Sequence, residues 1–145
     1  MRIYTIGFTK KTAREFFEKL QSADAKYLLD TRLNNKSQLA GFAKKGNIEY
    51  FVEKLTEMEY LEFPLLAPTS EILKQYRSDS DWDAYEKKYN RLLVERKVAR
   101  KIDPALFADG VVLLCSEPTA EKCHRRLAAE FLKDRCIQGA KIVHL

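Results

Sequence analysis

Short apolar runs alternate along this chain with longer segments in which apolar residues recur every three or four positions. The short runs are typical of β-strands, and the longer periodic segments of helices. Strands are predicted over residues 2–6, 26–30, 60–63, 111–115 and 141–145. Strand–helix–strand alternation at both ends of the chain indicates right-handed crossovers and a mostly parallel sheet. The predicted fold class is therefore α/β, a single three-layer domain over residues 1–145 with a Rossmann-like sheet flanked by helices.

Capping residues predict where several helices begin. Thr12 and Glu15 have the spacing of a capping box, and Asn47 precedes another periodic apolar stripe. A short helix is predicted over residues 70–77, and Asp81 precedes a long one that continues to residue 102. A turn through residues 116–119 is expected to open the last helix, which carries Leu127. Residues 31–46 are polar and irregular.

The composition fits one folded domain without a membrane segment. The chain has 145 residues, of which 46% are hydrophobic and 32% charged, and this length suffices for a core that needs no disulfide. The apolar run at residues 111–115 is far shorter than the ~20 residues of a membrane span. Residues 1–4 enter a strand directly, without the pattern of a signal peptide. We expect a cytoplasmic protein with no membrane partner, and reduced thiols at its three cysteines.

The excess of positive charge is local. Lys and Arg number 26 against 21 Asp and Glu, a net charge of +5. Residues 85–101 alone account for this surplus, because their only acidic residues are Glu86 and Glu95 against Lys87, Lys88, Arg91, Arg96, Lys97, Arg100 and Lys101. Such a stripe can bind the phosphates of a nucleic acid, with Lys87, Lys88, Arg91, Lys97 and Lys101 as the candidate contacts. It can equally be the solvated face of a helix.

Residues that could form a functional site follow three of the predicted strands, the first of which is followed by Gly7. Asp30 and Arg32 follow the second strand, while Cys115 and Glu117 follow the fourth. Residues 123–126, Cys-His-Arg-Arg, lie in the opening turns of the next helix. Ligands of parallel α/β sheets bind outside the carboxyl ends of strands, so we expect these residues to converge there with Gly7. The candidate catalytic residues are Asp30, Cys115, Glu117 and His124, and the candidate phosphate-binding residues are Arg32 and Arg125.

Each candidate also has a structural interpretation. Asp30 and Arg32 can form an ion pair that anchors a loop, and Cys115 and Cys123 can be small hydrophobic core residues. His124 is either a hydrogen-bonded core histidine or a group that titrates near neutral pH.

Arg125 points more clearly to an anion. A cation in the first turn of a helix is unfavourable with the helix dipole, so an acidic partner is expected nearby. That partner is a bound anion or, in the structural interpretation, the side chain of Glu117.

The sequence predicts no metal and no cofactor. The chain has no Cys-x-x-Cys pair, and neighbouring ligands such as Cys123 and His124 on one helix would point about 100° apart. It also lacks a Cys-x5-Arg loop, a Gly-x-Gly-x-x-Gly turn and a Walker loop.

Several of these motifs together resemble the domain-of-unknown-function 488 family. The most specific are Leu-Cys-Ser-Glu at 114–117, Cys-His-Arg at 123–125 and Val-His at 143–144. Residues 4–7, the Asp-x-Arg turn at 30–32, and the stretches 33–38 and 66–69 agree with it as well. The resemblance covers essentially the whole chain and implies a small α/β domain. The chain differs from many members at Phe8, where they have His or Tyr, and at Thr31, where they have Val.

Three functions are compatible with the sequence. In the first, the protein binds a phosphate-bearing ligand, a nucleotide or nucleic acid, at the carboxyl edge of the sheet, with acid–base or hydrolytic chemistry there. In the second, it is a non-catalytic nucleic-acid-binding module that uses residues 85–101. In the third, it is a structural or interaction protein whose polar residues only fix loops.

Overall fold

The computed structural model describes residues 1–36, 40–117 and 119–145, and in these ranges five strands form one sheet. The strand order is β3-β2-β4-β1-β5, and every pair of neighbours is parallel. The strands are β1 (Arg2–Gly7), β2 (Tyr27–Asp30), β3 (Glu59–Glu62), β4 (Val111–Cys115) and β5 (Lys141–His144). The prediction of an α/β fold with a mostly parallel sheet is confirmed. Ser37 and Gln38 of the family-like stretch, and Pro118 of the predicted turn, lie outside the described residues.

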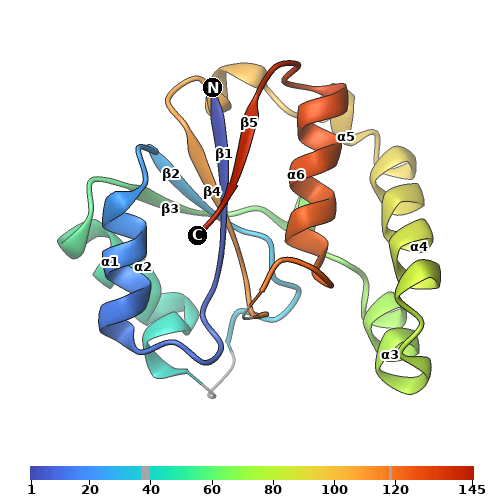
Figure 1. Cartoon of the computed structure of the whole chain (residues 1–145), viewed down its shortest axis with the longest axis horizontal. Helices are drawn as coiled ribbons and strands as arrows, with labels where there is room; N and C mark the ends of the chain where they lie inside the picture. The colour runs from blue at the N-terminus through green and yellow to red at the C-terminus, as the bar shows by residue number, and fades with distance from the viewer. Residues whose placement is uncertain (37–39, 118) are drawn as a thin grey trace.

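Helices cover both faces of the sheet, which makes three layers (Figure 1). On one face lie α1 (Ala13–Ser22) and α2 (Lys45–Leu55). On the other face α6 (His124–Arg135) packs on the sheet, with α4 (Trp82–Glu95) against it and α3 (Ser70–Asp79) and α5 (Val98–Lys101) beside α4. Short 3-10 turns occupy Gly41–Ala43, Pro64–Leu66 and Pro104–Phe107. None of the described helices is long and apolar enough to cross a membrane.

The central strand β4 is apolar throughout because both of its faces are covered. Val111 and Leu113 belong to the core under α4 and α6, whereas Val112 and Leu114 belong to the core under α1 and α2. All four side chains are fully buried. A continuous apolar run is typical of a parallel strand between two helical layers, which is why the sequence pattern identified this strand correctly.

Two predicted helix starts have different outcomes. Thr12 caps α1 by accepting a hydrogen bond from the Glu15 amide at 3.1 Å, as expected. The prediction for Asn47 is wrong, because α2 begins at Lys45 and Asn47 lies inside it. The Asn47 amide instead donates to the Gly41 carbonyl at 2.8 Å and ties the preceding turn to the helix.

The basic stretch is not one helix, so this part of the prediction is corrected. Helix α4 ends at Glu95, and Lys97 adopts a left-handed conformation with φ of 56° before the short α5. The break turns the chain so that Val98 is fully buried in the core. Arg96 is engaged structurally, since its Nη1 donates to the carbonyls of Leu65 and Ala67 at 2.9 and 2.6 Å.

The last helix begins later than predicted. Helix α6 starts at His124, and Cys123 is its N-cap residue, with extended φ and ψ of −143° and 140°. Residues 119–123 form turns and bends between β4 and this helix. Cys123 therefore lies outside the helix rather than on its apolar stripe.

Candidate functional site

Three adjacent strand ends form the candidate site. In the sheet Gly7 of β1 pairs with Cys115 of β4, and Leu114 of β4 pairs with Asp30 of β2. The chain leaves β1 towards α1 on one face and leaves β4 towards α6 on the other (Figure 1). This is a topological switch point, where ligands of open α/β sheets bind. The predicted convergence of residues at the carboxyl edge is confirmed.

Backbone fills the space directly between the β1 and β4 loops. The Thr9 amide donates to the Ser116 carbonyl at 3.0 Å. A Cβ atom on Gly7 would lie 1.6 Å from the Glu117 carbonyl oxygen, so only glycine allows this close approach. The space directly at the switch point is therefore closed.

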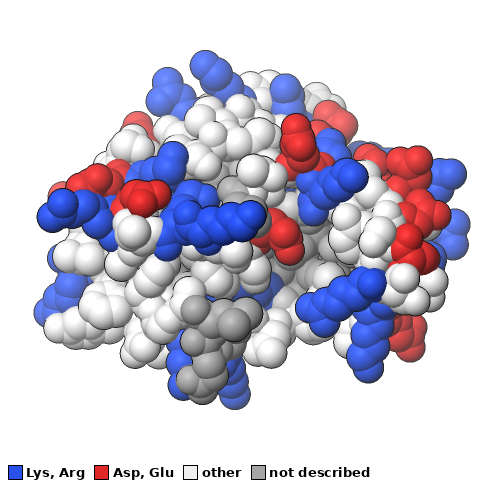
Figure 2. All heavy atoms as spheres, turned by 60° about the horizontal axis from the view of Figure 1, so that its bottom comes forward, with Lys and Arg blue, Asp and Glu red and all other residues white. Residues whose placement is uncertain are grey.

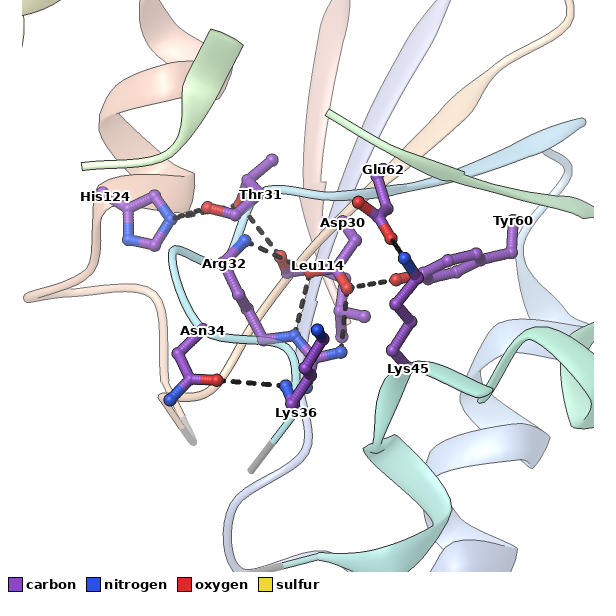
Figure 3. Close-up of polar contacts among 10 residues, drawn as sticks. All are labelled: Asp30, Thr31, Arg32, Asn34, Lys36, Lys45, Tyr60, Glu62, Leu114 and His124. Atoms are coloured by element: carbon purple, nitrogen blue, oxygen red, sulfur yellow. Dashed lines mark hydrogen bonds and ion pairs between the residues drawn. The ribbon is translucent and has the colours of Figure 1, made fainter. Parts of the chain in front are cut away.

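Asp30 and Arg32 form a buried ion pair beneath the site (Figure 3). Arg32 donates through Nε and Nη2 to the two Asp30 carboxylate oxygens at 2.9 and 2.8 Å. The Tyr60 hydroxyl donates to the same carboxylate. Asp30 thus positions Arg32, as the structural interpretation expects. The Arg32 Nη1, in contrast, has no hydrogen-bond partner among the described residues.

Arg125 is 1% exposed and points into the protein. Its Nη1 donates to the Cys115 sulfur at 3.0 Å and to the main-chain carbonyl of Glu117 at 2.6 Å. The partner that Glu117 supplies is therefore its backbone oxygen, while its side chain is exposed. The Arg125 guanidinium thus contacts both a main-chain oxygen and the Cys115 sulfur.

The two cysteines of the site differ in their acidity. Burial opposes a charge on Cys115, yet the Cys123 thiol and the Arg125 guanidinium beside it lower the pKa of Cys115. Burial and the neighbouring Cys115 raise the pKa of Cys123 well above its usual value. The pair therefore favours a thiolate on Cys115 and a thiol on Cys123.

His124 is held in one orientation. Its Nε2 lies 2.8 Å from the Thr31 carbonyl oxygen, and since a carbonyl only accepts, Nε2 carries the proton (Figure 3). Burial lowers the pKa of His124 to about 4, and the Arg125 charge acts in the same direction. His124 is accordingly neutral near pH 7, with its lone pair on Nδ1.

A cavity of about 170 Å³ lies beside the switch point, on the α6 side of the sheet; we call it the strand-end cavity. Its lining comes from the β2 loop, α3, α4 and the β4–α6 connection. The residues are Arg32, Leu33, Asn34, Pro68, Leu73, Tyr76, Arg77, Trp82, Tyr85, Cys115, Ser116, Glu117, Lys122, Cys123 and His124.

The strand-end cavity separates the predicted site residues into two groups. Arg32, Cys115, Glu117 and His124 line it, while Asp30 and Arg125 lie behind its wall and hold other groups in place. Lys87, Lys88, Arg91, Lys97 and Lys101 are exposed and do not line it. Figure 2 looks onto this edge of the molecule, where Lys and Arg are scattered with Asp and Glu between them rather than gathered in a stripe.

Sequence reasoning missed the aromatic wall and two cations of the cavity. Trp82 and Tyr85 are stacked, with ring centroids 4.9 Å apart, and Tyr76 packs on both. Their helical spacing predicts only a core face, because an aromatic side chain against a core and one against a cavity give the same pattern. No motif in the sequence marked Arg77 or Lys122 as a site residue.

The fold and the site define a small three-layer α/β protein with a polar, thiol-containing cavity at the carboxyl edge of a parallel sheet. The family model described as Domain of unknown function DUF488 matches residues 12–132. The chain belongs to this family, in agreement with the resemblance of its motifs. No curated protein and no solved structure matches the chain.

Proposed function

We propose that the protein binds a phosphate-bearing ligand with a planar ring, of the nucleotide class, in the strand-end cavity. The observation that carries the proposal is the buried Arg32 in the cavity wall, whose Nη1 has no partner among the described residues. Buried guanidinium groups are normally fully hydrogen-bonded, so an unused N–H pair there favours an incoming acceptor. Phosphate oxygens are the acceptors that arginine binds best.

The Asp30 pair prepares Arg32 for this role. It fixes the guanidinium through two hydrogen bonds, so that little conformational entropy is lost on binding. Arg77 and Lys122 add exposed cations to the lining. These three residues supply the phosphate-binding part of the proposal.

The aromatic wall supports the planar ring. Tyr76, Trp82 and Tyr85 line the cavity, and stacking of a base on an aromatic side chain contributes about 1–3 kcal/mol. Ligand sites for drug-sized molecules are commonly about 300–1,000 Å³. The smaller volume here, about 170 Å³, fits one end of a nucleotide, with the rest extending over the rim.

Acid–base chemistry on such a ligand would fall to the residues that line the cavity. Glu117 supplies an exposed carboxylate for it. Asp30 is already held by Arg32 and Tyr60, which favours a positioning role for it over a catalytic one.

Trp82 is the single tryptophan of the chain, so its fluorescence reports on the cavity directly. We expect AMP to quench it at saturable concentrations. Adenosine should bind at least about tenfold more weakly, because a charge-assisted hydrogen bond contributes about 1.5–3 kcal/mol. Inorganic phosphate should compete with AMP without quenching.

Arg77→Ala and Lys122→Ala should each weaken AMP binding, while Lys87→Ala, a matched change of an exposed cation away from the cavity, should leave it unchanged. Equal affinities for AMP and adenosine would refute the phosphate part of the proposal. No quenching by any nucleotide would refute all of it.

A further inference from the structure

We propose that Cys115, Cys123 and His124 form a zinc site that opens onto the strand-end cavity. Their two sulfur atoms and one imidazole nitrogen all lie within 4.8 Å of one another. The ligands come from the end of β4 and the start of α6, which the fold brings together although the sequence separates them. The inference does not rest on nucleotide binding, since metal binding alone tests it.

The conformation of Cys123 removes one of the two arguments against a metal, the divergence of neighbouring helical side chains. Two neighbouring residues of a helix would point about 100° apart. Cys123 is extended, however, and precedes the first helical residue, His124. The sulfur and the imidazole can therefore face the same point, and we revise the expectation of no metal.

His124 is oriented as a metal ligand would be. Histidine ligands usually donate their second ring N–H to a carbonyl or carboxylate, which fixes the ring and the tautomer. Nε2 of His124 makes this bond to the Thr31 carbonyl, at 2.8 Å. Nδ1 lies on the opposite side of the ring (Figure 3), and it is the nitrogen left for a metal.

Both sulfurs accept hydrogen bonds from Arg125. Its Nη1 lies 3.0 Å from the Cys115 sulfur, and its backbone N–H donates to the Cys123 sulfur at 3.4 Å. Such donors stabilise a thiolate on Cys115, and the Cys123 thiol releases its proton when it binds the metal. Two thiolates balance the charge of one Zn²⁺, and neutral imidazole adds none.

The three ligand types favour zinc, and their position in the cavity wall favours a site with one open coordination position. Two thiolates with one imidazole suit a tetrahedral Zn²⁺, whose bonds of about 2.3 Å to sulfur and 2.0 Å to nitrogen require donors roughly 3.5–3.8 Å apart. The ligand atoms lie within 4.8 Å of one another, so metal binding requires the side chains to move closer together. All three residues line the cavity, so the fourth position faces it. Three protein ligands with one open position are typical of zinc sites that bind water or substrate.

The test is zinc titration of the reduced, metal-free protein in competition with a chromophoric chelator. We expect one tightly bound Zn²⁺ per chain. Cys123→Ser should weaken binding more than 100-fold, beyond the about 10- to 100-fold typical of losing a group that only hydrogen-bonds a ligand. Serine keeps the capping ability at this position, so the variant should fold. His124→Gln should weaken binding in the same way.

Cys136→Ser is the matched control, because Cys136 is the third free cysteine and lies outside the cluster. It should bind zinc like the parent. Substitution by Co²⁺ should give the thiolate charge-transfer and visible bands of tetrahedral cobalt, and Cys123→Ser should abolish them. Absence of stoichiometric zinc in the parent would overturn the proposal. So would zinc binding that survives Cys123→Ser or is lost in Cys136→Ser.

Discussion

The carboxylate of Asp30 connects the loop after strand β2 with strand β3. It accepts from the Arg32 backbone and side chain, and from the Tyr60 hydroxyl of the neighbouring strand β3. The spacing of Asp30 and Arg32 offered their pairing as one of two interpretations, and the structure shows the ion pair. Tyr60 was not predictable as a partner, because that contact depends on the register of β2 against β3.

Removing the Tyr60 hydroxyl should destabilise the protein. Tyr60→Phe keeps the ring but leaves one buried oxygen of Asp30 without this donor, which costs about 1–3 kcal/mol. Tyr50→Phe is the matched control, since Tyr50 is 57% exposed, and it should change stability by less than about 0.5 kcal/mol. Urea unfolding of both variants measures the difference. Equal midpoints for Tyr60→Phe and the parent would show that this hydrogen bond contributes nothing.

At the scale of elements, termini were harder to predict than the elements themselves. The Thr12 cap has a local signature, in which the capping side chain and its target amide lie three residues apart. The start of α6 has no such signature, because its N-cap residue is Cys123, and cysteine is not among the residues that usually cap helices. This error affected the candidate site. A Cys123 inside the helix argued against a metal site, whereas the structure brings Cys115, Cys123 and His124 together.

The break between α4 and α5 gives a prediction about stability. Lys97 has a φ of 56°, a left-handed conformation that costs residues with a Cβ atom about 1–2 kcal/mol. Lys97→Gly should therefore be more stable than Lys97→Ala by about 1 kcal/mol. Both variants remove the same charge, so the difference between their stabilities reflects the backbone conformation at residue 97. Thermal unfolding measures it, and a more stable alanine variant would contradict the left-handed conformation.

For the whole molecule, the apolar pattern was sufficient to predict the layers and the direction of the strands. It was also sufficient to predict which edge gathers polar residues, because the carboxyl ends of parallel strands meet there. The cavity was not predictable. Tyr76 of α3 and Trp82 of α4 line it, but their spacing in the sequence is that of ordinary core residues. Charge was the least informative property. The surplus of positive charge at residues 85–101 lies on two helices. One of its members, Arg96, donates its hydrogen bonds to main-chain carbonyl groups.

The strand-end cavity and residues 85–101 are alternative locations for binding the phosphates of a nucleic acid. They make opposite predictions for the salt dependence of binding. Each phosphate contact contributes about 0.7 to the slope of log affinity against log salt for a single strand. If the cavity binds the phosphates, Arg77→Ala with Lys122→Ala should flatten the slope for a short oligonucleotide by about one to two units. Lys97→Ala with Lys101→Ala, which removes the same charge from α5 and the residue before it, should then leave the slope unchanged. Flattening by the second pair alone would place the contact on the basic stretch and favour the non-catalytic nucleic-acid-binding module. Binding that does not depend on salt for the parent protein would contradict both locations.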